Sequence, residues 1–354
     1  ENLDSNLRQR GSQLCLFEGN SAAVLQNLTK ELLQQGIRPK LFFNRDVQVE
    51  YGIERDRAIL DFYRQLNLEC HLGLSSFLQE SDRRDSWYGE YYTYQRQPLY
   101  SAPAHINTPQ LSLDLPQLTF DELKQKYSQF WTADSGYFNG GESSAIATLD
   151  SFLRHRYQGY HWKLSRPWLA QKGATSHLSP YIAFGTVSTR QIYQSTKARA
   201  AELANHPKAE FSLRAFRDRL RWRDSFTQRL YHHPEIAHTN RYPEFDEWYS
   251  LLELKPEKQE LFEAWQEGET GFPLVDASMR QLKTMGWMNF RMRAMCATFL
   301  TINCGVSWHH GARHYMNCLI DGDLAIDNWQ WQMQAGVTNP LSDTFRIYNP
   351  NKNI

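Results

Sequence analysis

Cysteine is scarce in this chain: five of its 354 residues are Cys, and no two of them form a CxxC pair. An odd number of scattered thiols argues against a disulfide framework, and the missing CxxC argues against a structural zinc site. We therefore expect reduced thiols in a cytoplasmic protein without a metal centre. No apolar run reaches the length of a membrane span, and the residues from Glu1 onward do not resemble a signal peptide.

Net charge is also missing, because 39 Lys and Arg side chains balance 39 Asp and Glu side chains. This neutrality argues against indiscriminate nucleic-acid binding but leaves room for a local basic patch. Aromatic residues, in contrast, are abundant, with 11 Trp, 18 Tyr and 19 Phe. A chain of this length predicts about two domains and can bury a sizeable core.

Residues 1–78 have the alternating pattern of an α/β domain. Apolar strands are predicted at residues 14–17, 40–43 and 70–72, with helices between Asn20 or Ser21 and Gly36 and at residues 54–66. This βαβαβ order implies a parallel sheet, here a thin one of three strands. A further βαβ unit normally precedes such a pattern, so we expect the chain to begin inside a domain.

Residues 79–140 are predicted to connect this partial domain to a second one over residues 141–354. The connector is first charged, then rich in tyrosine and then interrupted by prolines, which is typical of a segment lying on the surface. From residue 141 onward helical periodicity dominates, so the second and larger domain is expected to be mostly α-helical.

Two polar motifs stand out in the helical part. Thr175, Ser176 and Ser179 precede an apolar run, where hydroxyls most commonly cap backbone N–H groups but also hold phosphate at the positive end of a helix. The segment 214–224 has five arginines, and such runs are usually solvated, salt-bridged helix faces. Trp222 among these arginines equally indicates a stacking surface beside phosphate-binding cations.

Tryptophan, arginine and aspartate recur between residues 271 and 350, in runs otherwise typical of buried helix. Asp321 and Asp323 in IDGDLA fit a cap or a salt-bridged turn, whereas the remaining ligands of an EF-hand calcium loop are absent. A buried aspartate needs a partner such as Arg293 to offset desolvation. Each tryptophan alone is most simply a core residue, but together they fit electron-hopping stations. These candidates are Trp287, Trp308, Trp329 and Trp331.

The stretches GFPLVDASMRQL, GWMNFRMRAM, IDGDLAIDNWQWQMQAG and FRIYNP, together with TSHLSPY, closely resemble the DNA photolyase/cryptochrome family. The resemblance implies a Rossmann-like α/β domain followed by a helical domain that binds FAD. Relative to the family, the chain lacks the opening strand–helix unit and ends soon after FRIYNP, so we expect a piece of a longer protein. Part of the antenna-pigment site lies in that opening unit, so the sequence leaves the antenna pigment unidentified.

The resemblance also assigns site residues. Trp331 and Trp308 match the proximal and middle tryptophans of the photoreduction chain, with Trp248 the nearest candidate for the distal one. Trp222 matches a tryptophan of the lesion pocket, and Arg293 and Asp321 match an ion pair beside the flavin. The full set of cofactor-binding positions is Tyr160, Thr175, Ser176, Leu178, Ser179, Phe216, Arg219, Arg223, Trp287, Phe290, Arg293, Asp321, Asp323 and Asp327.

Several positions depart from the photolyase pattern. Asp327 replaces the asparagine that usually faces flavin N5, as in plant-type cryptochromes, and an acid there can protonate the flavin. Arg219, Phe290 and Met333 replace the glutamate, asparagine and tryptophan that contact a cyclobutane dimer. The two histidines of (6-4) photolyases are also missing from their positions. His177 and the pair His309 and His310 lie elsewhere, and they are expected to be exposed or to cap helices.

The resemblance therefore favours a blue-light-driven electron-transfer protein that repairs pyrimidine dimers. Its partner would be damaged DNA, with the dimer flipped into the FAD pocket. The alternative is a cryptochrome-type photoreceptor without repair activity, in which a flavin change alters the conformation read by an unknown signalling partner. A third reading is an atypical photolyase in which Arg219 contacts phosphate or base.

Overall fold

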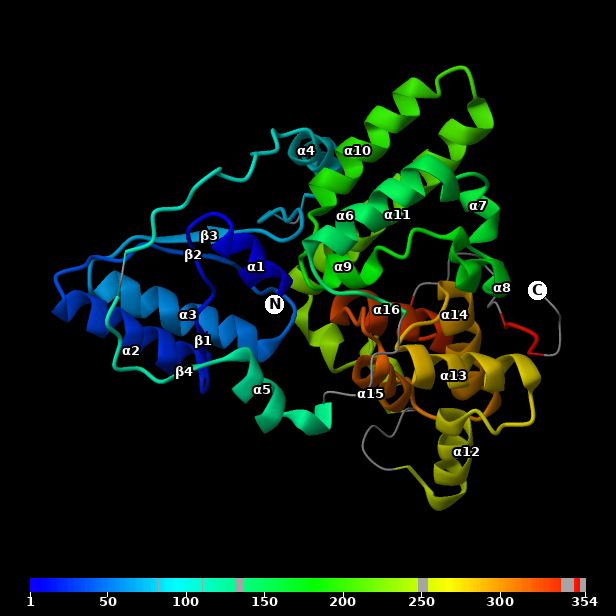
Figure 1. The fold of residues 1–354 in the computed structure, drawn as a ribbon. Coiled ribbons are helices and arrows are strands. Elements are labelled where there is room, and N and C mark those ends of the chain that lie inside the picture. Colours follow the sequence, from blue (N-terminus) through cyan, green and yellow to red (C-terminus); the bar gives the residue numbers. More distant parts are fainter. Residues whose placement is uncertain (82, 110, 131–136, 248–253, 339–346, 351–354) are drawn as a thin grey trace. The chain divides into compact units, whose positions relative to one another are not determined.

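The computed structural model describes the whole chain except residues 82, 110, 131–136, 248–253, 339–346 and 351–354 (Figure 1). The chain divides into two compact units. The first contains Glu1–Phe77 and Pro98–Ser143, and the second contains Leu78–Gln97 and Ser144–Ile354. The segment expected to be a connector, residues 79–140, is therefore shared between the units.

The first unit is α/β, as predicted, but its strands form two separate pairs. β2 (Leu41–Asn44) and β3 (Cys70–Gly73) are parallel. β1 (Leu16–Phe17) instead pairs antiparallel with β4 (Gln117–Leu118). The predicted three-stranded parallel sheet is thus wrong for its first strand, because β1 finds its hydrogen-bonding partner in a segment far along the chain.

Helices cover the rest of this unit. They are α1 (Asn2–Arg8), α2 (Ser21–Gln34), α3 (Glu50–Gln65), α5 (Phe120–Lys126) and the short 3-10 helix η1 (Ser128–Phe130). The side chain of Asn20 caps α2 by accepting a 3.1 Å hydrogen bond from the N–H of Ala23, as the sequence predicts. Gly36, just beyond the helix, has a φ of 78°, a conformation that glycine adopts without strain.

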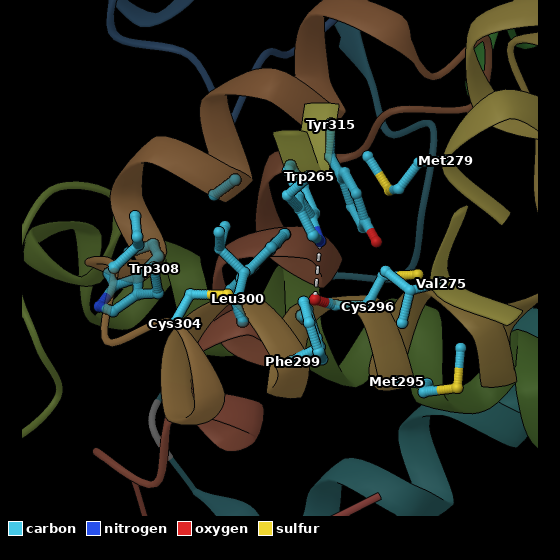
Figure 2. Packing of buried hydrophobic residues seen from close by; sticks show 14 of the residues in the cluster. Trp265, Val275, Met279, Met295, Cys296, Phe299, Leu300, Cys304, Trp308 and Tyr315 are labelled. Atoms are coloured by element: carbon cyan, nitrogen blue, oxygen red, sulfur yellow. Dashed lines mark hydrogen bonds between the residues drawn. The ribbon is translucent and has the colours of Figure 1, made fainter. Parts of the chain in front are cut away.

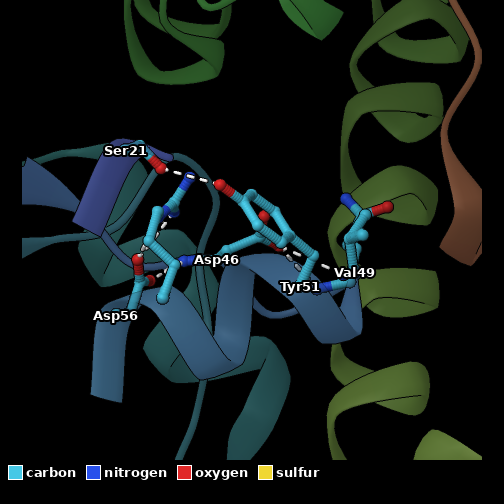
Figure 3. Close-up of polar contacts among 7 residues, drawn as sticks. Ser21, Asp46, Val49, Tyr51 and Asp56 are labelled. Atoms are coloured by element: carbon cyan, nitrogen blue, oxygen red, sulfur yellow. Dashed lines mark hydrogen bonds and ion pairs between the residues drawn. The ribbon is translucent and has the colours of Figure 1, made fainter. Parts of the chain in front are cut away.

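A hydrogen-bonded turn leads from β2 into α3 (Figure 3). The carboxylate of Asp46 accepts from the backbone N–H of Val49 at 3.2 Å. The carboxylate of Asp56, in the second turn of α3, accepts a hydrogen bond from the backbone N–H of Asp46 at 2.7 Å. A hydrogen bond of 2.9 Å between the hydroxyls of Tyr51 and Ser21 ties α3 to α2. Side chains within α3 thus set the angle at which the chain enters that helix.

The second unit is helical, as predicted, and no helix among its described residues is long and apolar enough to cross a membrane. Its α-helices are α4 (Arg84–Gln95), α6 (Glu142–Ser151), α7 (Tyr160–Lys163), α8 (Pro167–Leu169), α9 (Ser179–Ala183), α10 (Thr189–Glu202), α11 (Pro207–His232), α12 (Pro256–Glu267), α13 (Pro273–Met285), α14 (Phe290–Thr298), α15 (Trp308–Cys318) and α16 (Leu324–Ala335). The π-helical segments are η2 (Phe152–Arg156), η3 (Ala170–Ala174) and η6 (Phe299–Asn303), and the 3-10 helices are η4 (Pro234–Ala237) and η5 (Pro243–Phe245).

The tyrosine-rich helix α4 belongs to this unit, although the sequence suggested a surface segment. Trp87 and Tyr91, four residues apart, are both buried and their rings stack at 5.2 Å. The side-chain amide of Gln194 on α10 donates to the carbonyl of Gln95 at 2.9 Å. The helix α4 is buried because its aromatic residues at helical spacing form one apolar face, which packs against a neighbouring helix.

The largest hydrophobic core of the unit is built by α12 to α16 (Figure 2). Trp265 lies at its centre, fully buried, with its indole N–H donating to the carbonyl of Cys296 at 3.0 Å. Trp308, Tyr315 and Trp331 belong to the same core. A second core forms between α6, α7, α9, α10 and α11.

Candidate functional site

Buried charges gather where α14 approaches the start of α16. Arg293 Nη2 donates to both carboxylate oxygens of Asp321 at 2.8 Å, and its Nε donates to the carbonyl of Met288 at 3.0 Å. Burial opposes a charge on Arg293, but the carboxylates of Asp321 and Asp327 outweigh that effect and raise the pKa of Arg293. The structure therefore brings together the pair that the sequence assigned.

Asp323 and Asp327 share the first turn of α16. Asp323 caps the helix by accepting from the N–H of Ile326 at 3.2 Å, while Asp327 accepts from the N–H of Asp323 at 3.2 Å. Asp323 also lies 3.6 Å from the guanidinium of Arg223. Asp323 is thus a helix cap and an ion-pair partner at once.

Asp327 is a buried acid whose pKa lies close to neutral pH. Burial is the main reason that its pKa rises from 3.8 to about 7, with Arg293 acting against the rise and Asp321 adding to it. The carboxyl group is therefore able to hold a proton that it can donate near neutral pH. No cluster of three or more His, Cys, Asp or Glu arranged for a metal ion occurs among the residues that the structure describes.

Trp331 follows Asp327 by one helical turn and is 2% exposed. Its ring lies 6.1 Å from that of Trp265 and 4.8 Å from that of Tyr315, measured between centroids. It also packs against α15 at Gly311, where a Cβ atom would come within 2.2 Å of the indole. Gly311 therefore allows the close approach of Trp331 to the helix that begins with Trp308. The distal candidate Trp248 lies outside the described residues.

The segment 175–179 differs from the capping motif that the sequence suggested. Leu178 precedes the first residue of α9 and gives no side-chain cap, and the hydroxyl of Ser176 accepts a long hydrogen bond of 3.4 Å from the N–H of Leu178. The helix is only five residues long, so it has a small dipole. The hydroxyl of Thr175 is buried and has no hydrogen-bond partner among the described residues. The predicted side-chain cap is therefore wrong, because the residue at the N-cap position is Leu178, whose apolar side chain cannot accept a hydrogen bond.

Arg156 holds this segment in place and was missed by the sequence. Its guanidinium donates to four backbone carbonyls, those of Thr148, Gly173, Thr175 and Ser176. Burial lowers the pKa of Arg156, and the carbonyls supply the compensating hydrogen bonds. In the local sequence FLRHRY nothing distinguishes it from the exposed Arg154, so pattern alone could not have found it.

Trp287 lies against the same segment. Its indole N–H donates to the hydroxyl of Ser179 at 3.4 Å, and its ring lies 4.7 Å from the imidazole of His177. His177 is half-buried, adopts a left-handed φ of 55°, and contacts the carbonyl of Ala170 at 2.8 Å. Burial lowers the pKa of His177, with the hydrogen bond to the Ala170 carbonyl acting against the shift. The expectation of an exposed or capping His177 is wrong, because tertiary packing on Trp287 encloses it.

Tyr160 and Phe216 form a buried aromatic contact between α7 and α11, with 5.5 Å between ring centroids. Burial raises the pKa of Tyr160 to about 12, and the nearby Arg219 opposes the shift. Phe216 and Leu220 are both buried while Trp222 is 46% exposed, so α11 has a buried face and an exposed face.

A row of alternating rings and guanidinium groups lies at the surface of the helical unit. Arg219 sits 4.1 Å from the ring of Trp222 and 5.7 Å from that of Phe290. Arg291 sits 5.0 Å from the ring of Phe290 and 5.7 Å from that of Tyr348. Burial lowers the pKa of Arg219, whose Nε lacks a hydrogen-bond partner among the described residues. We call these five residues the aromatic–arginine row.

Known proteins are similar to this chain in sequence and fold. Residues 216–354 match the family model described as the FAD binding domain of DNA photolyase. The deoxyribodipyrimidine photo-lyase of Synechococcus sp. is 32% identical, over 99% of this chain and 72% of that protein. The corresponding protein of Alkalihalophilus pseudofirmus is 30% identical, over 97% of this chain and 70% of that protein.

Solved structures of a photolyase and a cryptochrome are also similar to this chain in fold. A bacterial class III photolyase from Agrobacterium tumefaciens superposes with a TM-score of 0.78 at 27% identity, covering 99% of this chain and 71% of that one. A cryptochrome from Synechocystis sp. superposes with a TM-score of 0.78 at 25% identity, covering 98% of this chain and 71% of that one.

Proposed function

This chain belongs to the DNA photolyase/cryptochrome family, and from this premise we propose that it binds FAD and uses blue light to repair pyrimidine dimers in DNA. One observation carries the proposal. Asp327, a buried acid able to hold a proton, and Trp331, a buried indole able to give an electron, lie one turn apart on α16 beside the Arg293–Asp321 pair. A proton donor and an electron donor at one buried site suit a cofactor that takes up both.

The described residues fit FAD. The hydroxyl of Thr175 and Nε of Arg219 are buried without hydrogen-bond partners among them, and a ligand with phosphate and carbonyl oxygens would satisfy such groups. Arg293, already fixed by Asp321, offers a buried positive charge to the polar edge of a ring.

The proposed roles follow the sequence assignments. The diphosphate would be held by Thr175, Ser176, Leu178 and Ser179, and the rings would be enclosed by Tyr160, Phe216, Arg219, Arg223, Trp287, Phe290, Arg293, Asp321, Asp323 and Asp327. FAD bound there supplies one-electron transfer driven by light. Trp331 would give an electron to this site and be reduced again by Trp308, while Asp327 would supply or retain a proton according to pH. Arg156 keeps the segment 175–176 in position.

Damaged DNA would contact the aromatic–arginine row. Trp222 presents a half-exposed ring on which a flipped base can stack, and Arg219 and Arg291 offer positive charge to phosphates or base carbonyls. Arg219 and Phe290 would then contact the lesion in place of the family's glutamate and asparagine.

A cryptochrome-type photoreceptor is the second candidate, because Asp327 and the altered lesion positions Arg219 and Phe290 favour it. In that role the light-driven change at Asp327 would be read by a signalling partner, and no DNA would be repaired.

A repair assay separates the two functions. Dimer-bearing oligonucleotide is illuminated with the FAD-loaded, photoreduced protein, with a dark sample as control. Light-dependent loss of dimers, reduced in Trp222→Ala but retained in Tyr100→Ala, at an exposed tyrosine of the first unit, supports repair. Normal FAD photoreduction without any loss of dimers would overturn repair in favour of the photoreceptor.

A further inference from the structure

Trp308 is joined to a carboxylate through one buried amide. Its indole N–H donates to Oδ1 of Asn240 at 2.8 Å, and Nδ2 of Asn240 donates to Oδ1 of Asp246 at 2.7 Å. The backbone N–H of Asn240 donates to the same Asp246 oxygen at 3.0 Å. Trp308 is 1% and Asn240 2% exposed, so this short chain of hydrogen bonds is shielded from water up to Asp246.

Helix α16, which carries Trp331, holds this arrangement in place. Asn328 donates to the carbonyl of Ala237 at 2.7 Å. The amide of Gln332, next to Trp331, donates to the carbonyl of Thr239 at 3.0 Å and accepts from the N–H of Arg241 at 2.8 Å. The loop 237–241 is therefore fixed on both sides of Asn240.

The two hydrogen bonds transmit the charge of Asp246 to the indole of Trp308 through the Asn240 amide. A carboxylate polarises the Asn240 amide, whose oxygen then points more negative charge at the indole N–H of Trp308. A positive charge left on Trp308 by loss of an electron is stabilised by this fixed arrangement. An amide oxygen is too weak a base to take the indole proton, so the charge stays on Trp308.

Trp329 has the opposite environment. It lies two residues before Trp331 on α16, is buried, and has the guanidinium of Arg229 3.7 Å from its ring centroid. A cation at that distance opposes a second positive charge on the ring. Trp308 on α15 and Trp329 on α16 thus differ in the sign of the charged side chain that acts on them.

We propose that Asp246, acting through Asn240, makes Trp308 the preferred tryptophan to carry positive charge, and that Arg229 excludes Trp329 from that role. Asp246 is a positioning residue, and the inference rests on the proposed electron transfer. Trp331 gives one electron to the cofactor site and takes one from Trp308. Trp308 keeps its Nε1 proton and recovers one electron from an external thiol reductant.

His309, stacked on Trp308 with 3.8 Å between ring centroids, does not compete with Asp246. Its nitrogens contact the hydroxyl of Ser307 and the carbonyl of His238, both at 3.0 Å. Burial lowers the pKa of His309, with the His238 carbonyl and the carboxylate of Asp246 acting against the shift, so burial disfavours a positive charge on the ring beside Trp308.

The test uses the full chain with bound FAD and no DNA. Flavin photoreduction under blue light with a thiol reductant and the yield of tryptophan radical after a laser flash are both measured. Asp246→Asn keeps the oxygen that accepts from Asn240 but removes the charge, and we expect both quantities to fall about tenfold. Asp246→Glu keeps the charge and should retain most of the rate. Glu247→Gln, at the exposed neighbouring carboxylate, should match the wild type.

Reference variants separate the possible failures. Trp308→Phe gives the rate without the Trp308 route, and adding Arg229→Gln to it should raise photoreduction several-fold by admitting Trp329. Wild-type rates in Asp246→Asn, or no gain from Arg229→Gln, would overturn the inference while leaving the proposed function intact. If Asp246→Asn fails to bind FAD, the inference is tested instead by comparing photoreduction in Trp308→Phe with and without Arg229→Gln. A wild-type protein that binds FAD but shows no photoreduction would instead overturn the proposed electron transfer.

Discussion

Replacing Asp327 with asparagine should remove a pH-dependent loss of stability. Burial raises the pKa of Asp327 in the folded protein from 3.8 to about 7. Because the folded-state pKa is raised, the stabilising contribution is complete below the unfolded-state pKa near 3.8. It is lost as the pH rises through the folded pKa, since the unfolded chain releases a proton that the folded chain keeps. The asparagine side chain of the variant has no proton to release, so the variant lacks this dependence.

The size of the stability change follows from the difference between the two pKa values of Asp327. The pKa rises from 3.8 to about 7, a difference of about 3.2 pH units. At 1.36 kcal/mol per unit this corresponds to about 4 kcal/mol. Between pH 4.5 and 6.5 the stability of the wild type relative to Asp327→Asn should therefore fall by about 1.4 kcal/mol per pH unit and level off above pH 7. The titration of the histidines cancels in this difference, because both proteins share them.

Urea unfolding at a series of pH values from 4.5 to 8.5 measures the effect, with flavin content checked to be equal in the two proteins. Glu260→Gln, which neutralises an exposed carboxylate of α12, should parallel the wild type at every pH. A stability difference between wild type and Asp327→Asn that does not change with pH would refute the assignment of Asp327 as a buried, nearly neutral acid.

Two further substitutions test the site. Asp321→Ala leaves the Arg293 guanidinium buried without its carboxylate, so we expect a loss of about 3–5 kcal/mol in unfolding free energy and of most bound flavin. Flavin absorbance per protein measures this, and full retention would count against the pair. Gly311→Ala places a methyl group 2.2 Å from the Trp331 ring, which should cost about 1–3 kcal/mol in urea unfolding. Gly89→Ala, with open space around it, should be neutral or slightly stabilising, and equal effects of the two substitutions would contradict the packing argument.

Patterns within one element were predicted well. The Asn20 cap and the helical character of the second unit both follow from local sequence patterns. The family resemblance and its FAD-binding domain were likewise confirmed, because order and spacing of many motif positions survive in the sequence. Burial of His177 and the antiparallel partner of β1 were missed, because both depend on segments distant in the chain.

The sequence alone determined the residue types available to the site, their order, and the family to which the chain belongs. Only the tertiary structure decided what surrounds each of them. Arg156 becomes a support for the segment 173–176, and Trp308 acquires a carboxylate through Asn240, a partner 68 positions away. The physical reason is that burial and distance set pKa values and charge stabilisation. Both quantities arise from contacts between helices, which no local periodicity records.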